Sequence, residues 1–302
     1  MKRFREKQAG LLSSTDLKTF KGQLLYWIFF GILVLAAICA LLPSLWMIAT
    51  AFKDTQEIYN QPDKFFPNNM SPSHLWGRIT EAWQTLQFGR SIINTIFRSI
   101  GEWVFGISFC GLGGYAISKL RPTGSRLIYA IILWIMMMPG SVRTVPLYLT
   151  FIKFPIGGIN FTNTYWPFFF MAAANCFNVM LFKNTFDGIS DSLIEAAEID
   201  SAGYFRIFVS IVIPLSLPVI IYTSIMLLSS AWGDFFFPYL LLTDEKIQTL
   251  PVKTYIMQKS QVGLKMNTYM MGLLITSIPT FLIFIVFQRK IMGGINVGGV
   301  KG

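Results

Sequence analysis

Apolar and polar stretches alternate along the chain in a pattern typical of helices that cross a membrane. A hydrocarbon core about 30 Å thick takes roughly 20 apolar residues to span as a helix. The apolar runs near this length are Leu24–Ala49, Ser99–Ser118, Leu127–Met138, Thr164–Phe182, Ile211–Ala231 and Met270–Phe287. The third run is short because Pro139 and Gly140 follow it, and the apolar stretch Val145–Phe154 either extends it or lies along the membrane surface. The pattern predicts an all-α membrane protein with about six transmembrane helices.

Composition strengthens this prediction. Hydrophobic residues make up 53% of the chain and charged residues 13%, with a mean hydropathy of +0.54. A soluble domain carries about 25% charged residues. The first run also continues well past the roughly 7–15 apolar residues of a signal peptide, so we interpret it as a retained span. We therefore expect a multi-pass protein of the cell membrane.

Basic residues gather at one set of connections, which sets the expected orientation. An excess of Lys and Arg marks cytoplasmic loops, and an even number of spans places both termini on the same side. The basic residues concerned are Lys2, Arg3, Arg5, Lys7, Lys18 and Lys21, then Lys119, Arg121 and Arg126, then Arg289 and Lys290. We expect residues 1–23 and 291–302 to be cytoplasmic segments that flank a membrane domain of residues 24–290, with residues 52–90 outside. Four lysines within residues 243–268 oppose this bias.

Motifs for catalysis, metal binding and nucleotide binding are absent from the sequence. The Gly-rich stretch Gly111–Gly114 lies inside the second run, and no Lys-Ser or Lys-Thr follows at the spacing of a phosphate-binding loop. Its glycines are better explained as places where helices approach closely. The cysteines are scattered among separate apolar runs and His74 is the lone histidine. We expect no catalytic residue, no metal site and no cofactor in this chain.

The net charge of +10 does not indicate a nucleic-acid partner. The basic residues are spread over loops on both faces and form no patch interleaved with aromatic residues. Membrane topology and anionic lipids explain the charge better.

One polar segment, Asp187–Pro218, interrupts the apolar pattern between the fourth and fifth runs. It carries five carboxylates, which cost several kcal/mol each in hydrocarbon and so must lie in water or against another protein. Asp191, Glu195 and Glu198 follow one another at helical spacing and predict an acidic stripe on one side of a helix. Small alanines beside the stripe would allow a partner to approach closely. A solvated loop helix explains the same pattern without a partner.

The segment resembles the EAA loop of ABC importer permeases. That loop reads EAA, three residues, Gly, nine residues and Ile-x-Leu-Pro, and here Glu195-Ala196-Ala197 opens it while Ile211-Val212-Ile213-Pro214 closes it at the same spacing. The chain departs from the pattern at Ser201, where Gly is usual, and at Ile213. If the backbone needs a positive φ at Ser201, that residue is strained, and Gly203 two positions later is the expected relief.

Further motifs extend the resemblance to the carbohydrate-uptake, maltose-type branch, and to the second of its two permease subunits. Their order along the chain follows that branch: Gly114–Leu120, Pro146–Tyr148, Asn163–Tyr165, Trp232–Phe235, Pro238–Leu240, Thr249–Val252 and the glycine-rich end Gly299–Gly302. Gly233 and Tyr239 depart from the usual Asn and Leu.

The resemblance implies a transport subunit and not an enzyme. The EAA loop would form a coupling helix between the fourth and fifth spans, seated in a cytoplasmic ATPase dimer that binds the ATP and Mg²⁺. The residues implicated are Glu195, Ala196, Ala197, Asp200, Ser201, Gly203, Ile211 and Pro214, with Met292–Gly302 as a further contact. A second permease subunit and an extracytoplasmic solute-binding protein that delivers a sugar or oligosaccharide would complete the importer. Closure of the ATPase pair would then drive alternating access.

Residues of the substrate pathway are predicted from side-chain type. Aromatic rings stack on sugars and buried amides need polar partners. The candidates are Trp166, Asn175, Asn178, Trp232 and Asp234. An aromatic belt at the membrane interface explains single aromatic residues equally well.

Alternatives remain at this point. An ion-gradient-driven secondary transporter would use ionisable groups inside its spans, for which Arg98, Glu102 and Asp234 are the candidates. Arg98 and Glu102 also suit a simple pair along one helix. An ABC permease for a non-sugar solute fits the EAA loop as well, because that loop reports the energy source and not the cargo.

Overall fold

The computed structural model describes residues 19–86, 88–260 and 265–292, and within these ranges the chain is helical and contains no strand. The N-terminal basic residues up to Lys18 and the tail residues 293–302 lie outside the described residues. The helices are α1 Phe20–Phe52, α2 Thr55–Asn60, α3 Pro72–Leu86, α4 Phe88–Tyr115, α5 Ser125–Met137, α6 Gly140–Ile152, α7 Trp166–Ala173, α8 Cys176–Asp187, α9 Asp191–Ile199, α10 Tyr204–Ile207, α11 Ile213–Leu215, α12 Leu217–Gly233, α13 Phe236–Leu241, α14 Leu250–Ser260 and α15 Met266–Met292. Short π-helical segments, Ala116–Leu120 and Phe208–Val212, continue α4 and α10, and a 3₁₀ turn covers Glu245–Ile247.

Three stretches are long and apolar enough to span a membrane, namely Phe20–Phe52, Phe88–Leu120 and Met266–Gln288. They coincide with the first, second and sixth predicted runs. Two bent helix pairs, α5 with α6 and the segment Tyr204–Leu215 with α12, raise the number of spans to as many as five. The fourth run is divided between α7 and α8, because the chain leaves the helix at Ala174 and Asn175 caps the start of α8. An all-α membrane fold is thereby confirmed, while the count of six spans stays a prediction.

One bend corrects the fifth predicted span, and the other excludes a straight extension of the third run, which ends near Met138 as predicted. The third run does not extend straight into Val145–Phe154, because α6 leaves α5 at 109°. Pro139 has extended backbone angles there and lacks an N–H to continue the helix. The fifth run turns by 83° around Ser216, so its straight part begins at Leu217 and not at Ile211. Pro218 then lies in the first turn of α12, where a missing N–H costs nothing.

The described residues fall into two compact units. One consists of the residues before Thr80 together with Lys265–Leu274. Within it, Asn267 Nδ2 donates to the backbone oxygen of Lys53 at 2.9 Å, which ties the start of α15 to the end of α1. Most side chains of α1 are exposed in the isolated chain although they are strongly apolar, as expected for a helix that faces lipid or another subunit.

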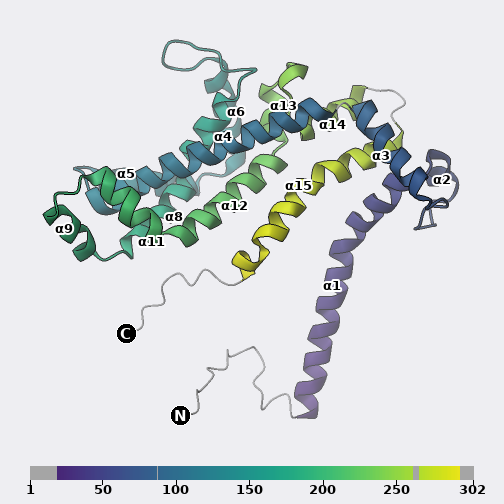
Figure 1. The fold of residues 1–302 in the computed structure, drawn as a ribbon, viewed down its shortest axis with the longest axis horizontal. Coiled ribbons are helices and arrows are strands. Elements are labelled where there is room, and N and C mark those ends of the chain that lie inside the picture. The colour runs from purple at the N-terminus through teal and green to yellow at the C-terminus, as the bar shows by residue number, and fades with distance from the viewer. Residues whose placement is uncertain (1–18, 87, 261–264, 293–302) are drawn as a thin grey trace. The chain divides into compact units, whose positions relative to one another are not determined.

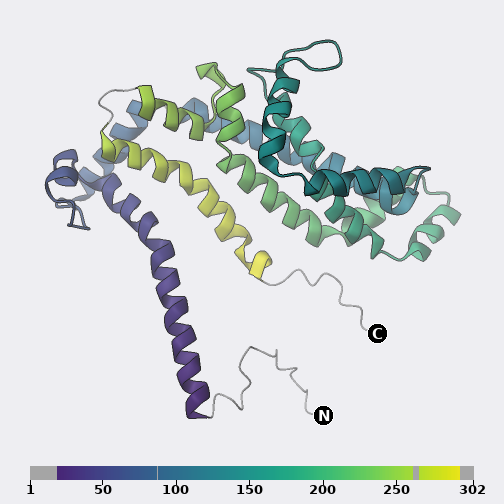
Figure 2. The ribbon, with the colours of Figure 1, turned by 180° about the vertical axis from the view of Figure 1, so that it is seen from behind.

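The other unit is built around α4, which packs against α7, α8 and α12 (Figures 1 and 2). Gly114 makes the contact with α8 possible, because an added Cβ would lie 2.7 Å from Phe182 Cβ and 2.9 Å from the backbone nitrogen of Lys183. Gly106 likewise lies against Leu227 of α12. The prediction that glycines of the second run serve close helix contacts is therefore confirmed at these positions.

Candidate functional site

The EAA segment forms a short helix, α9, with one buried face and one exposed face. Ile194 and Ala197 are buried in the protein's own core, together with Phe186, Ile207 and Phe208. Glu195, Ala196 and Glu198 are exposed, as are Asp191 and Asp200. Of the two alanines proposed to contact an ATPase, Ala196 is therefore the exposed one, and Ala197 anchors α9 to its own chain.

The end of α9 explains why the EAA pattern favours glycine at the position of Ser201. Ser201 has a φ of 58°, in the left-handed region. Its N–H donates to the oxygen of Glu198 at 2.9 Å, and the N–H of Ala202 donates to the oxygen of Ala197 at 3.0 Å. This pair of bonds is the Schellman arrangement, in which glycine fits the left-handed residue without steric cost. Gly203 has a φ of −68°, so the relief expected from it is not found.

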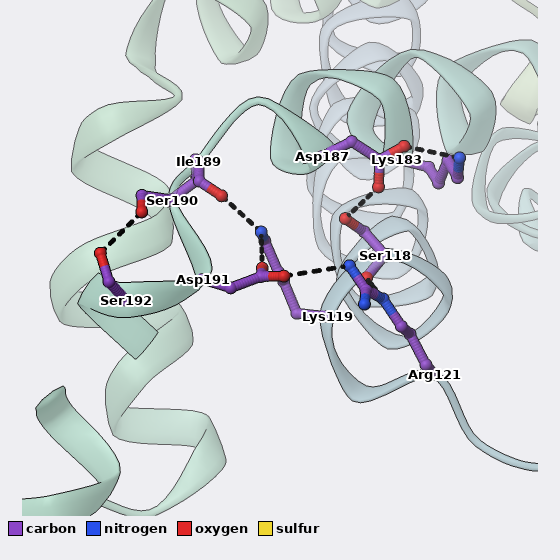
Figure 3. Close-up of polar contacts among 9 residues, drawn as sticks. All are labelled: Ser118, Lys119, Arg121, Lys183, Asp187, Ile189, Ser190, Asp191 and Ser192. Atoms are coloured by element: carbon purple, nitrogen blue, oxygen red, sulfur yellow. Dashed lines mark hydrogen bonds and ion pairs between the residues drawn. The ribbon is translucent and has the colours of Figure 1, made fainter. Parts of the chain in front are cut away.

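Asp191 ties the start of α9 to the C-terminal end of the second predicted span (Figure 3). Lys119 Nζ lies 2.6 Å from one carboxylate oxygen of Asp191 and donates to the backbone oxygen of Ile189 at 2.5 Å. Arg121 Nη2 lies 3.3 Å from the other carboxylate oxygen. The hydrogen bond and charge of Lys119 hold the pKa of Asp191 below its usual range. Asp191 is thus paired within the chain, so Glu195 and Glu198 are the residues of the acidic stripe that are exposed for a partner.

A second set of contacts joins the same end of α4 to the end of α8 (Figure 3). Ser118 donates to Asp187 at 2.6 Å, and Lys183 forms an ion pair with Asp187 at 2.6 Å. Partial burial acts to raise the pKa of Asp187, but the hydrogen bonds from Lys183 and Ser118 outweigh it and hold the pKa below its usual range. Because α9 follows α8 directly, both contacts restrain α9 against the membrane helices.

Sequence reasoning assigned Lys119 and Arg121 only to membrane orientation and missed their contact with Asp191. Asp191 lies 72 positions after Lys119 and 70 after Arg121, and no spacing rule joins residues so far apart. The remaining predicted coupling residues follow α9. Ile211 is half-buried against the core, and Pro214 is exposed in the first turn of α11.

The predicted pathway residues do not all meet. Asn175 and Asp234 line one open cavity of about 370 Å³, together with Arg98 and Glu102. Trp166 packs among Phe105, Phe169 and Phe170 instead. Asn178 is buried in α8. Trp232 donates to the backbone oxygen of Thr276 at 2.9 Å and lines a different cavity of about 510 Å³.

Arg98 joins the charged groups of the first cavity. Its Nε lies 2.5 Å from Glu102 Oε1 and its Nη2 lies 2.7 Å from Asp234 Oδ2. Arg98 and Glu102 are paired along α4 as expected, and Asp234 at the end of α12 completes the cluster. Among the described residues, no group of three or more His, Cys, Asp or Glu residues is placed to hold a metal ion.

Known proteins share both the sequence pattern and the fold. The probable ABC transporter permease YurM of Bacillus subtilis is 27% identical over 292 residues, which cover 94% of this chain and 91% of YurM. The trehalose/maltose transport system permease MalG of Thermococcus litoralis is 26% identical over 274 residues, covering 90% of this chain and 95% of that protein. A chain in the crystal structure of a bacterial ABC transporter that imports the acidic polysaccharide alginate shares the fold, with a TM-score of 0.76, 23% identity and coverage of 93% and 99%.

The family model described as the inner membrane component of binding-protein-dependent transport systems matches residues 106–292, which is more than half of the chain and includes α9 and its contacts. A permease driven by an ion gradient is thereby set aside. The chain belongs to this family, the membrane-spanning permease subunits of ABC importers.

Proposed function

We propose that this chain is the second permease subunit of an importer for a sugar or oligosaccharide, and that α9 is its coupling helix. The observation that carries the proposal is the exposed face of α9. Glu195 and Ala196 are exposed there, whereas Asp191 and Ala197 contact other parts of the same chain and fix the helix in place. A carboxylate on a rigid exposed helix suits an Arg or Lys of a partner. The sugar class is supported by relatives such as the trehalose/maltose permease.

Energy for transport would come from a cytoplasmic ATPase dimer, which would bind the ATP and Mg²⁺. The role of this chain is to receive the movement of that dimer. Movement of α9 would pass to the end of α4 through the ion pair of Asp191 with Lys119. The contacts of Asp187 with Ser118 and Lys183 would carry it between the ends of α4 and α8, because they are short and involve charged groups. Movement of α4 then reaches α7 and α12, which pack along it.

The rest of the importer would comprise a second permease and an extracytoplasmic solute-binding protein. Exposed apolar side chains along α1 provide a surface for a second permease or for lipid. The basic residues beside α9, including Lys119 and Arg121, support a cytoplasmic position for α9 and for both termini.

The test is to tag the chain, extract it gently from its own membrane and identify what copurifies by mass spectrometry. The proposal predicts a second permease and an ATPase, and the recovered complex should take up a saccharide when reconstituted with its binding protein. Recovery of the chain alone, under conditions in which other membrane complexes stay intact, would contradict the proposal. Uptake of a non-sugar solute in place of every saccharide would contradict the cargo class only.

A further inference from the structure

An open cavity of about 600 Å³ lies where the π-helical segment after α4 meets the start of α5 and the end of α8. Its volume falls within the roughly 300–1,000 Å³ that is usual for ligand pockets. The lining contains one acidic side chain, Asp187, and three basic ones, Arg121, Arg126 and Lys183. None of the predicted pathway residues lines this cavity. Its excess of positive charge favours an anion.

The two arginines of this cavity are only partly neutralised. Arg126 is exposed and forms no ion pair with any residue that the structure describes. Arg121 Nη2 lies 3.3 Å from Asp191, but the same carboxylate is held more closely by Lys119, at 2.6 Å. A guanidinium presents several N–H donors in one plane, which matches the oxygens of a phosphate group. The two arginines therefore favour a ligand that carries a phosphate.

The third cation, Lys183, is held at the cavity wall. Its Nζ lies 2.6 Å from Asp187 and 4.5 Å from the centroid of the Tyr129 ring. The Lys183 side chain is still 21% exposed. An ammonium has three N–H donors, so Lys183 can donate to a ligand oxygen while it keeps its pair with Asp187.

The start of α5 adds donors at the same wall. Ser125 is 9% exposed, its hydroxyl has no hydrogen-bond partner among the described residues, and its oxygen is not sealed from solvent. Gly124 precedes it with a φ of 90° and offers no side-chain cap to the helix. Both residues line the cavity. Because the free N–H groups and the dipole of a helix start favour an anion, the first turn of α5 supports the same ligand as the basic residues.

The exposed face of α5 indicates a lipid as the source of the phosphate. Leu127, Ile131 and Trp134 follow one another at helical spacing and are all exposed. Because α5 belongs to a bent pair that qualifies as a membrane span, this apolar face begins beside the cavity and continues into the membrane. A phospholipid with its phosphate in the cavity would place its acyl chains along this face. Basic pockets of this kind between membrane helices suit anionic headgroups.

From these observations we propose that the cavity binds an anionic phospholipid, whose phosphate accepts hydrogen bonds from Arg121, Arg126, Lys183 and Ser125. A zwitterionic lipid is disfavoured, because its choline would bring a further cation into a basic site. The site goes beyond the proposed import function and is the same whichever solute the importer carries. Since Arg121 and Lys183 also contact Asp191 and Asp187, the bound lipid joins the contacts that restrain α9.

The first experiment identifies the lipid beside the cavity in the intact complex. Leu127→p-benzoylphenylalanine is reconstituted with its partner subunits into membranes of phosphatidylglycerol and phosphatidylcholine in equal parts, with matched acyl chains, and the irradiated chain is analysed by mass spectrometry. We expect phosphatidylglycerol to be enriched about fivefold or more among the crosslinked lipids. Trp134→p-benzoylphenylalanine, farther along the same face, is the control and should report the composition of the membrane.

Equal proportions of the two lipids at both positions would overturn the proposal. Crosslinking of the Leu127 variant to an ATPase subunit in place of lipid would also overturn it, because the cavity would then be a protein contact.

The second experiment tests the basic lining. Arg126→Gln, combined with the crosslinker at Leu127, removes a guanidinium that no described residue neutralises, so the complex should assemble normally. We expect the enrichment of phosphatidylglycerol to fall about fivefold, the usual contribution of one basic residue at a membrane surface. Arg206→Gln makes the same change at an exposed arginine of α10 that does not line the cavity, and it should leave the enrichment unchanged. An unaltered enrichment in the Arg126→Gln complex would overturn the site.

A third measurement distinguishes a lipid from a soluble anion with the same chemistry. The crosslinking at Leu127 is repeated with inorganic phosphate in excess, and with chloride at the same ionic strength to match the screening of charges. We expect the enrichment of phosphatidylglycerol to be the same in both, because free phosphate lacks the acyl chains that hold a lipid against α5. Loss of the enrichment with phosphate but not with chloride would assign the cavity to a soluble anion and overturn the proposal.

Discussion

At the scale of single residues, Ser201 is the clearest departure from the favoured sequence of its family. Its positive φ is imposed by the hydrogen bonds that end α9, and a side chain with a Cβ pays a steric cost in this conformation. The strain is located where α9 meets the segment leading to α10, and it therefore bears on how firmly α9, the proposed coupling helix, is held.

Replacing Ser201 with Gly is expected to stabilise the protein. Glycine adopts a φ of 58° without steric cost, which should contribute about 1 kcal/mol, partly offset by the greater freedom of glycine in the unfolded chain. The midpoint of thermal unfolding of the purified complex should rise by a few degrees. Gly203→Ala is the matched control, because Gly203 has a negative φ and open space around its Cβ position, so its midpoint should barely change. A lower midpoint for Ser201→Gly would mean that the serine hydroxyl has a stabilising contact that outweighs the strain.

At the scale of helices, the contact between α4 and α8 depends on a glycine. The Cβ of an alanine at position 114 would collide with Phe182 Cβ and with the backbone of Lys183, neither of which can move without shifting α8. Because α8 leads into α9, a shift here also disturbs the position of α9.

We expect Gly114→Ala to destabilise the protein by about 1–3 kcal/mol, the usual cost of overpacking. The neighbouring Gly113→Ala is the control, since the nearest side-chain atoms would lie 3.8 Å from its Cβ, an ordinary van der Waals distance. Thermal unfolding of both purified variants distinguishes them. Equal midpoints for the two would show that α4 and α8 are not packed as closely as the distances at Gly114 require.

The helices themselves could be predicted from sequence, but their bends and contacts could not. Long apolar runs indicate α1, α4 and α15 because a helix satisfies every backbone group within the run itself when it lies in lipid. The bend at Ser216 was missed, because a proline indicates where a helix starts and says nothing about the angle to the preceding one. Helical spacing indicated that Glu195 lies on the polar side of α9. The pairing of Arg98 with Asp234 spans 136 positions and depends on how α4 and α12 pack, which no local pattern encodes.

At the scale of the whole protein, we propose that α9 transfers movement from an ATPase to the membrane helices. Lys119 at the end of α4 pairs with Asp191 at the start of α9, and Asp187 lies at the end of α8, which leads into α9. The Glu195 side chain is exposed and can meet a partner. This arrangement separates the residues that hold α9 to its own chain from those that we propose contact the ATPase. A change at Glu195 should therefore affect coupling while leaving the fold intact.

The most direct measurement is uptake and ATPase activity of the reconstituted complex carrying Glu195→Lys, with Asp63→Lys as a charge reversal at an exposed position outside α9. The reversal places a cation where a partner cation is expected, and like charges in contact cost several kcal/mol. We predict that the Glu195→Lys chain folds and reaches the membrane, while saccharide uptake and the stimulation of ATPase activity by the binding protein fall by about tenfold or more and the control stays normal. Normal uptake and normal stimulation in an assembled Glu195→Lys complex would contradict the role of α9 as the coupling helix.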